Sequence, residues 1–418
     1  MQLAASVLPA HAEALSLPRA EPLAGQAPPS NPGPLRRRLA KLFESGSFSW
    51  SAGALLLSLI AAAPLIAIAI MALHSSGDTW PHLIENVLPG VIQHTLILMA
   101  GVAIIALVTG TGTAWLVTMY RFPGRGLFQW LLLLPLAMPT YIIAYTYVDV
   151  FDYSGPFQAA LREFAGWRTK SDYWFPDIRS LGGAIFVMSL VLYPYVFISA
   201  RASFMRQSVC HLEVARTLGR TPAGVFFTVA LPLARPAIAV GVSLAMMECL
   251  NDIGAVEHFG VRTLTLGIYT TWLGRGNLGG AAQIALVMFV FVVALLWLER
   301  SGRRKQAFHH TTSHDYPLHR TPLAGWRGWA ATLFCLLPVG FGFLLPGGVL
   351  LSFAVTRFSE AATAAFAEAV VNTLLLSALA AAIAVLAGLF LAYANRIAGT
   401  VVVRLAVRLA SVGYAIPG

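Results

Sequence analysis

The densest group of side chains that could bind a cation lies at residues 141–153. Phenol and carboxylate oxygens are suitable ligands for a hard cation. Tyrosines also collect at membrane–water interfaces because their rings are amphipathic, and we favour this interface role over a cation site. The group consists of Tyr141, Tyr145, Tyr147, Asp149, Asp152 and Tyr153. We take Tyr145 and Asp149 as candidate lining of a solute path.

A second polar group, Glu248, Asn251 and Asp252, ends an apolar stretch. Ionisable groups are costly inside a bilayer unless they face protein or a water-filled cavity. The three residues therefore either line a path for a solute or mark the outer boundary of a membrane span.

Other candidate chemistry is weak. The histidines of the segment 309–319 match no recognised metal site, and this polar segment reads as a solvated linker. Cys210, Cys249 and Cys335 are far apart and show no paired metal spacing. No G-x-x-x-x-G-K-[ST] loop is present, so we expect no ATP hydrolysis by this chain. We also expect it to bind no metal and no cofactor.

The composition indicates that lipid is the main solvent of the chain. Hydrophobic residues make up 57% of the 418 residues and charged residues only 11%, whereas a soluble domain carries about 25% charged residues. The net charge of +10 does not predict nucleic-acid binding, because the basic residues lie in short clusters between apolar stretches.

An all-α polytopic membrane protein with about eight or nine transmembrane helices is the predicted fold. A spanning helix needs about 20 mostly apolar residues. Windows of this kind lie near 52–73, 91–118, 127–148, 181–200, 233–253, 278–298, 329–356 and 370–394, and a ninth begins near 402.

The loops between these windows predict the orientation, because Lys and Arg accumulate in short cytoplasmic loops. Arg36, Arg37, Arg38 and Lys41 precede the first window, which places the N-terminus in the cytoplasm. The basic and acidic loops then alternate, and the loop 149–180 is the one of mixed charge.

An internal repeat relates two parts of the chain by a shift of 278 positions. The shift pairs 94–98 with 372–376, Gly110 with Gly388, and Pro139 with Pro417. It predicts four regions, and the last of them is an incomplete copy of the second. These are a disordered cytoplasmic tail at 1–46, a first transmembrane half at 47–300, a cytoplasmic linker at 301–328 and a second half at 329–418.

The loop after the fourth window has the pattern of two helices separated by a break. Gly219 suits a helix C-terminus, where a left-handed residue is common. Thr221 can cap the next helix, with Pro222 at its first position. Ala215 and Gly219 lie on one side of the first helix at i and i+4, where small residues let another backbone approach.

This loop resembles the "EAA" docking loop of ATP-binding-cassette importer permeases. The residues at matching places are Glu213, Ala215, Gly219, Val229, Leu231 and Pro232, while Val214 departs from the alanine of the pattern. The residues that we expect to contact an ATPase are Glu213, Ala215, Arg216, Gly219, Leu231 and Pro232. The segments 135–139, 172–180, 192–196 and 213–236 also resemble the ferric-iron branch of these permeases, in which one chain carries two fused halves.

The resemblance implies a permease of the type I, MetI-like fold in the bacterial inner membrane, with no enzymatic activity of its own. It also implies cytoplasmic ATPase subunits that use ATP, a periplasmic substrate-binding protein, and ferric iron as cargo. Other solutes such as thiamine, sulfate or a polyamine remain alternatives. A secondary transporter driven by an ion gradient also has repeated halves and broken helices. A membrane-embedded enzyme would need a convergent set of acid, base or metal residues, and we find none.

Overall fold

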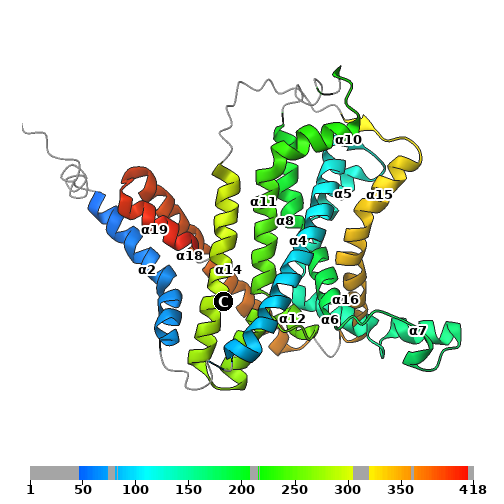
Figure 1. The fold of residues 1–418 in the computed structure, drawn as a ribbon, viewed down its shortest axis with the longest axis horizontal. Helices are drawn as coiled ribbons and strands as arrows, with labels where there is room; N and C mark the ends of the chain where they lie inside the picture. The colour runs from blue at the N-terminus through cyan, green and yellow to red at the C-terminus, as the bar shows by residue number, and fades with distance from the viewer. Residues whose placement is uncertain are drawn as a thin grey trace, which may run out of the picture.

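The computed structural model describes residues 47–73, 81, 83–207, 215, 217–304, 320–358 and 362–412. Within these residues, seven helices are long and apolar enough to cross a membrane, and an eighth crossing is formed if one bent pair of helices counts as a span. The predicted all-helical membrane architecture is confirmed (Figure 1).

The first part of the bundle contains a long central helix, α4. In chain order its elements are α2 (Ser47–Ala72), the π-helix η1 (Leu83–Val87), α4 (Leu88–Met119), β1 (Tyr120–Arg121), α5 (Arg125–Leu131), the 3-10 helix η2 (Leu134–Ala137), α6 (Thr140–Phe151), α7 (Pro156–Ala165), the 3-10 helix η3 (Lys170–Asp172) and α8 (Leu181–Arg206).

The remaining elements begin after the predicted docking loop. They are α10 (Pro222–Val225), the π-helix η4 (Phe226–Ala230), α11 (Leu231–Asn251), α12 (Gly254–His258), α13 (Leu264–Tyr269), the π-helix η5 (Thr270–Gly274), α14 (Leu278–Arg304), β2 (Thr321–Pro322), α15 (Trp326–Val339), the π-helix η6 (Gly340–Leu344), α16 (Leu345–Thr356), α18 (Ala364–Ile397) and α19 (Val401–Val412).

The predicted third span over 127–148 needs correction. The chain is broken there into α5, η2 and α6, and the bent pair 125–137 and 140–165 turns by 89°. Met138 is extended (φ −102°, ψ 128°) because the ring of Pro139 disfavours the α conformation in the residue before it.

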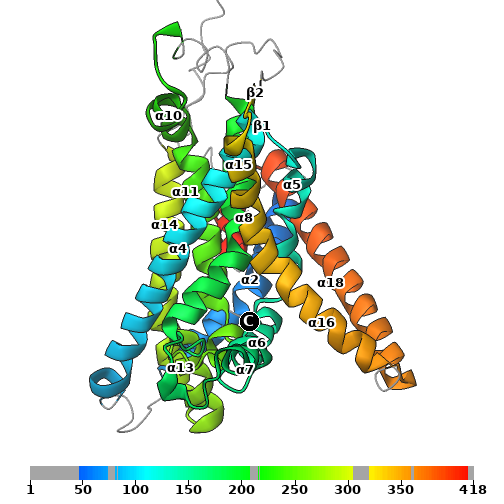
Figure 2. The same ribbon diagram turned by 90° about the vertical axis from the view of Figure 1, so that its right-hand side faces the viewer.

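The two ends of the bundle differ. One end, which we call the strand end, holds the parallel pair of β1 and β2 and also α10. The other, which we call the α7 end, holds α7, α12 and α13 (Figures 1 and 2). Successive spans run between the two ends in alternation (Figure 1).

Two large clusters of buried apolar residues fill the bundle. One, nearer the α7 end, joins α4, α6, α8, α11, α12 and α14. The other, nearer the strand end, joins α4, α5, α8, α11 and α15. Gly110 allows α4 and α8 to meet closely, because a Cβ at this position would lie 2.8 Å from the main-chain oxygen of Tyr193 and 2.9 Å from the main-chain nitrogen of Phe197.

A third, small cluster holds α2 against the last two helices. Ala54 of α2 packs with Ala394 of α18 and with Val403 and Ala406 of α19. The most apolar stretch of α18 has no buried residue, so α18 is covered far less than α4 (Figure 2).

Candidate functional site

The predicted docking loop lies at the strand end, between α8 and α10. Its described residues have the predicted break, because Gly219 has φ +80° and the amide of Arg220 donates to the main-chain oxygen of Ala215 at 3.1 Å. The hydroxyl of Thr221 accepts from the amide of Gly224 at 3.1 Å, and Pro222 starts α10. The left-handed glycine and the threonine cap predicted from the sequence are therefore both present.

The two small residues of this loop have different surroundings. Ala215 is only 8% exposed and belongs to the buried cluster near the strand end. Around Gly219 a built Cβ meets nothing within 4 Å, and the neighbouring Leu218 is 78% exposed. The described part of the loop that is open to a partner is therefore 218–220, while Glu213 and Arg216 lie outside the described residues.

The last two residues of the docking motif lie at the start of α11. Leu231 is its first residue, and Pro232 occupies its first turn, where no main-chain donor is lost. Val229 and Leu231 pack against the strand-end cluster, so they connect the loop to the core. Whether these residues contact an ATPase stays a prediction.

The polar group of α11 lies at the α7 end. Asp252 accepts a hydrogen bond from the amide of Ala255, in the first turn of α12, at 2.9 Å. Asn251 carries a buried side-chain oxygen without a partner among the described residues. Glu248 lies beside Tyr195 of α8. The three predicted path residues therefore occupy the junction of α11, α12 and α8.

The tyrosines of α6 do not form one cation site. Tyr145 is exposed and its ring lies 6.1 Å from that of His258 in α12. Tyr147 is fully buried, and its hydroxyl donates to the main-chain oxygen of Phe341 in η6. Asp149 is exposed, and no contact joins it to Asp252 among the residues that the structure describes. Tyr145 thus approaches the α11–α12 junction, whereas Asp149 does not.

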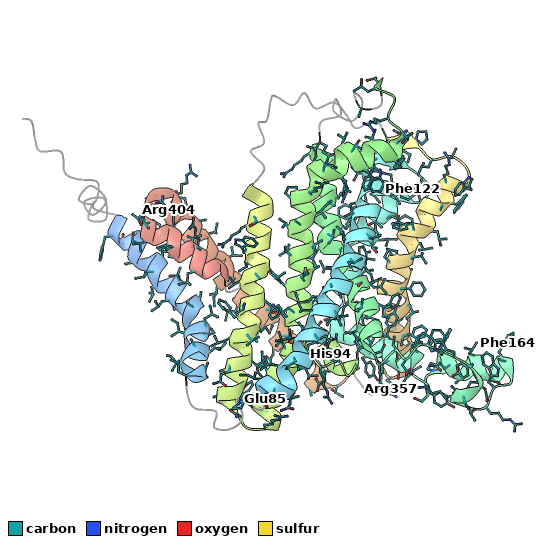
Figure 3. The ribbon with its side chains drawn as sticks, viewed as in Figure 1. Glu85, His94, Phe122, Phe164, Arg357 and Arg404 are labelled. Atoms are coloured by element: carbon teal, nitrogen blue, oxygen red, sulfur yellow. The ribbon has the colours of Figure 1, made fainter. Side chains whose placement is uncertain are left out.

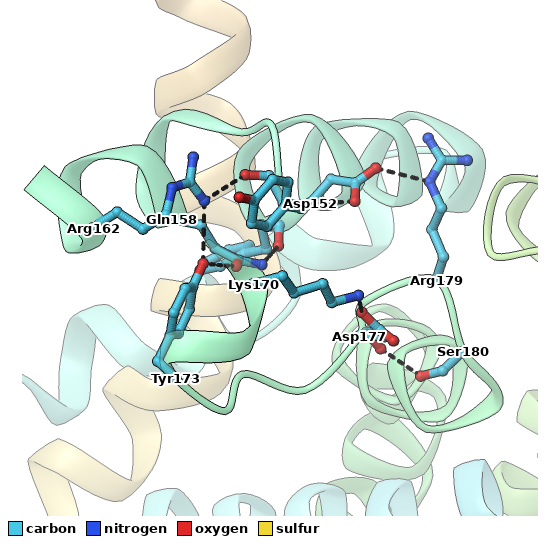
Figure 4. A network of polar contacts seen from close by, with 10 residues as sticks. Asp152, Gln158, Arg162, Lys170, Tyr173, Asp177, Arg179 and Ser180 are labelled. Atoms are coloured by element: carbon cyan, nitrogen blue, oxygen red, sulfur yellow. Dashed lines mark hydrogen bonds and ion pairs between the residues drawn. The ribbon is translucent and has the colours of Figure 1, made fainter. Parts of the chain in front are cut away.

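The segment that connects α6 to α8, which we call the excursion, contains α7 and η3 and is held together by polar contacts (Figure 4). Arg162 lies 4.3 Å from the ring centroid of Tyr153 and donates to its main-chain oxygen and to the hydroxyl of Tyr173. That hydroxyl donates in turn to Gln158. Two aromatic side chains on this excursion, Phe164 and Trp174, are 91% and 86% exposed.

Two charged groups in the excursion have shifted pKa values. Hydrogen bonds from the amides of Thr169 and Arg168 lower the pKa of the Asp172 carboxyl. The bond of 2.8 Å to Asp177 raises the pKa of Lys170. Both groups are exposed, so these contacts order the loop locally and contribute little to global stability.

Sequence reasoning missed two residues near the α7 end, His94 and Arg262. Both line a pocket together with Arg179 at the start of α8. In the sequence, His94 was noted only as part of the internal repeat. The one available signal of a functional role was a histidine between apolar residues near the start of a predicted span. The described residues contain no group of three His, Cys, Asp or Glu placed to hold a metal ion, and the histidines at 309–319 lie outside them.

Comparison with known proteins matches residues 106–305 to the family described as binding-protein-dependent transport system inner membrane component. A Fe(3+)-transport system permease protein of Haemophilus influenzae is 26% identical over 220 residues, which are 53% of this chain and 39% of that protein. The molybdenum transport system permease protein of Escherichia coli K12 is 29% identical over 46% of this chain and 85% of its own length. A sulfate transport system permease protein of Salmonella typhimurium is 34% identical over 36% of this chain and 50% of its own length.

Among solved structures, a bacterial alginate ABC transporter in complex with an alginate pentasaccharide-bound periplasmic protein is similar in part. The identity is 18%, the TM-score is 0.47, and the match covers 58% of this chain and 88% of the other. The chain thus spans about two fifths of the length of the iron permease and most of the molybdenum permease. Residues 106–305, just under half of the chain, thus match the domain described as binding-protein-dependent transport system inner membrane component.

Proposed function

We propose that this chain is the permease subunit of an ATP-binding-cassette importer in the bacterial inner membrane. It provides the path for the solute, separate ATPase subunits bind at the strand end, and a substrate-binding protein delivers the solute at the α7 end. The observation that carries the proposal is the loop at 215–222, where a left-handed Gly219 and a capped α10 present the exposed Leu218 beside the core of a family domain.

The charges at the two ends support the same orientation. Arg121, Arg206, Arg220 and Arg300 lie at the strand end, where α4 and α8 end and α10 begins. Short basic loops stay in the cytoplasm. We therefore place the strand end and the N-terminal tail on the cytoplasmic side.

The repeat supports a chain that contains related halves. The shift of 278 positions carries Ile397, the last residue of α18, onto Met119, the last residue of α4, and carries Trp326 at the start of α15 onto Phe48 in α2. The packing repeats as well, because α2 contacts α18 and α19 while α15 contacts α4 and α5. Each first helix therefore packs against the later helices of the other half.

For the cargo, we propose ferric iron. The support is the similarity to a Fe(3+)-transport system permease protein and the tyrosine and carboxylate oxygens near the α11–α12 junction. A small oxyanion is the second candidate, because relatives transport molybdenum and sulfate and because Arg179 and Arg262 line a pocket at the α7 end.

The docking assignment is tested with Leu218→Glu. We choose position 218 because Leu218 is exposed and its replacement leaves the break at Gly219 intact. A bulky side chain such as tryptophan at position 219 itself would strain the left-handed backbone there. The variant should lose co-purification with the ATPase and ATP-dependent uptake. The matched control is Leu73→Glu, which changes an equally exposed leucine at the α7 end.

Equal ATPase binding by Leu218→Glu and by the wild type would exclude this loop as the docking site. Uptake driven by an ion gradient without any ATPase would favour a secondary transporter instead. The cargo is measured separately, by ATP-dependent uptake of labelled ferric iron, sulfate and molybdate into vesicles that contain the complete importer. Uptake of an oxyanion without uptake of iron would reject the ferric proposal.

A further inference from the structure

A pocket of about 240 Å³ opens at the α7 end between α4, the start of α8 and the loop after α12. His94, labelled in Figure 3, approaches it from α4. The other lining residues are Arg179, Ser180, Leu181, Phe259, Gly260, Val261 and Arg262. Pockets for organic ligands usually have about 300–1,000 Å³, so this one suits a smaller solute.

The charged side chains that line the pocket are both arginines. The lining contains Arg179 and Arg262 and includes no carboxylate. The carboxylate of Asp152, outside this lining, accepts a hydrogen bond from the Nε–H of Arg179 at 3.0 Å (Figure 4). This bond fixes the guanidinium, and no hydrogen bond joins its terminal amino groups to the residues that the structure describes.

Two further features favour an anionic occupant. The Nδ1 atom of His94 is buried and has no hydrogen-bond partner among the described residues. Buried polar atoms normally have a partner, so we expect a ligand in the pocket to supply one. Ser180 caps α8 by accepting from the amide of Gly183, so the positive end of that helix dipole lies at the pocket.

We propose that this pocket binds a small inorganic oxyanion, with the guanidinium groups of Arg179 and Arg262 as its charged ligands and His94 as an additional polar contact. A guanidinium presents paired N–H donors that match the oxygens of a sulfate or phosphate group. Leu181, Phe259 and Val261 complete the lining with apolar side chains.

The inference deepens the proposed function, since the α7 end is the side at which solute would enter, but it does not depend on the cargo or on the ATPase. The test therefore uses the purified chain in lipid nanodiscs without partner subunits. Failure to dock an ATPase would leave the result of this experiment untouched, and the two proposals can fail separately.

The experiment is calorimetric titration with inorganic sulfate and, separately, inorganic phosphate, at neutral pH and low ionic strength. We expect saturable binding that weakens as sodium chloride screens the arginines. Arg262→Gln should weaken it at least tenfold, because loss of a charge-assisted contact removes a large part of the binding free energy. Arg275→Gln, which neutralises an exposed arginine at the same end outside the pocket, should bind as the wild type does.

Three results would overturn the proposal. The first is no saturable binding of either anion by the wild-type chain. The second is equal weakening by Arg262→Gln and Arg275→Gln, which would indicate a diffuse charge effect. The third is binding of sulfate or phosphate by Arg262→Gln as tightly as by the wild-type chain, which would exclude Arg262 as a ligand of the anion.

Discussion

The hydroxyl of Tyr147 in α6 donates a hydrogen bond of 2.7 Å to the main-chain oxygen of Phe341, 194 residues later in η6. Phe341 lies in a π-helix, where the regular ladder of main-chain bonds is altered. The bond connects the family domain to the helices that follow the predicted linker, and Tyr147 is buried in the large apolar cluster while Tyr145 is exposed.

Replacing Tyr147 with phenylalanine should destabilise the chain by about 1 kcal/mol, because it leaves the oxygen of Phe341 without this donor. The apparent Tm of the protein in detergent should fall by about 1–2 °C. Tyr145→Phe is the matched control on the same helix and should leave the Tm unchanged. A fall of the same size in both variants would contradict a specific role for the bond to Phe341.

Gly110→Ala should destabilise the bundle by about 1–3 kcal/mol, because the new Cβ would push α4 away from the backbone of α8. Gly388, its counterpart in the repeat, has open space around it, so Gly388→Ala should be neutral or gain up to about 1 kcal/mol from helix propensity. Thermal unfolding of the two variants measures the difference. Similar Tm values would show that the α4–α8 contact can relax at no cost.

Acid should loosen the excursion that contains α7. The folded pKa of Asp172 is lowered, so its stabilising bonds are present at neutral pH and are lost as the pH falls below about 4. A nitroxide attached at Phe164→Cys, after alanine replaces the native cysteines, reports the mobility of this segment by electron paramagnetic resonance. Its spectrum should sharpen between pH 5 and pH 3.

The control for the acid effect is Asp172→Asn in the same labelled chain. This variant should be mobile already at pH 7 and should change little on acidification, because the charge that attracts the amides of Arg168 and Thr169 is absent. If the variant and the parent sharpen together at low pH, another group controls the segment.

Arg162→Ala should loosen the same segment at neutral pH. The guanidinium joins Tyr153 and Tyr173, so its removal eliminates two hydrogen bonds and the contact with a ring, a local loss of about 1–3 kcal/mol. The same spin label measures the effect, and Glu163→Ala is the neighbouring control on an exposed side chain. An unchanged spectrum in Arg162→Ala would show that the aromatic contacts alone hold the segment.

Local features of the fold were predictable from residue types. The apolar windows predicted the spans, since about 20 apolar residues have no other stable place in a bilayer. The break at Gly219 and the cap at Thr221 were predictable because they depend on main-chain geometry within a few residues. The break at Pro139 was not predicted, because a proline by itself does not show that a membrane helix is interrupted. Pro64 and Pro194, for example, lie inside continuous helices.

The candidate sites were predictable only in part. The polar group at Glu248, Asn251 and Asp252 was found because charge is costly in an apolar span. Its neighbours Tyr195 and Tyr145 come from α8 and α6, and the sequence carries no signal that pairs them. Ala215 was expected at a partner surface, and the structure places its side chain in the core of its own chain.

By itself, the sequence determined that this chain has membrane-spanning helices and where most of them lie, and it predicted that two parts of the chain are related by a repeat. These properties depend on hydropathy, charge and register, which are local or periodic along the chain. Only the tertiary structure decided that α2 packs on α18 and α19, that Tyr147 reaches Phe341, and that His94, Arg179 and Arg262 share one pocket. In lipid, hydrophobicity does not select which helices meet, so close packing of small residues and a few long-range hydrogen bonds decide these contacts.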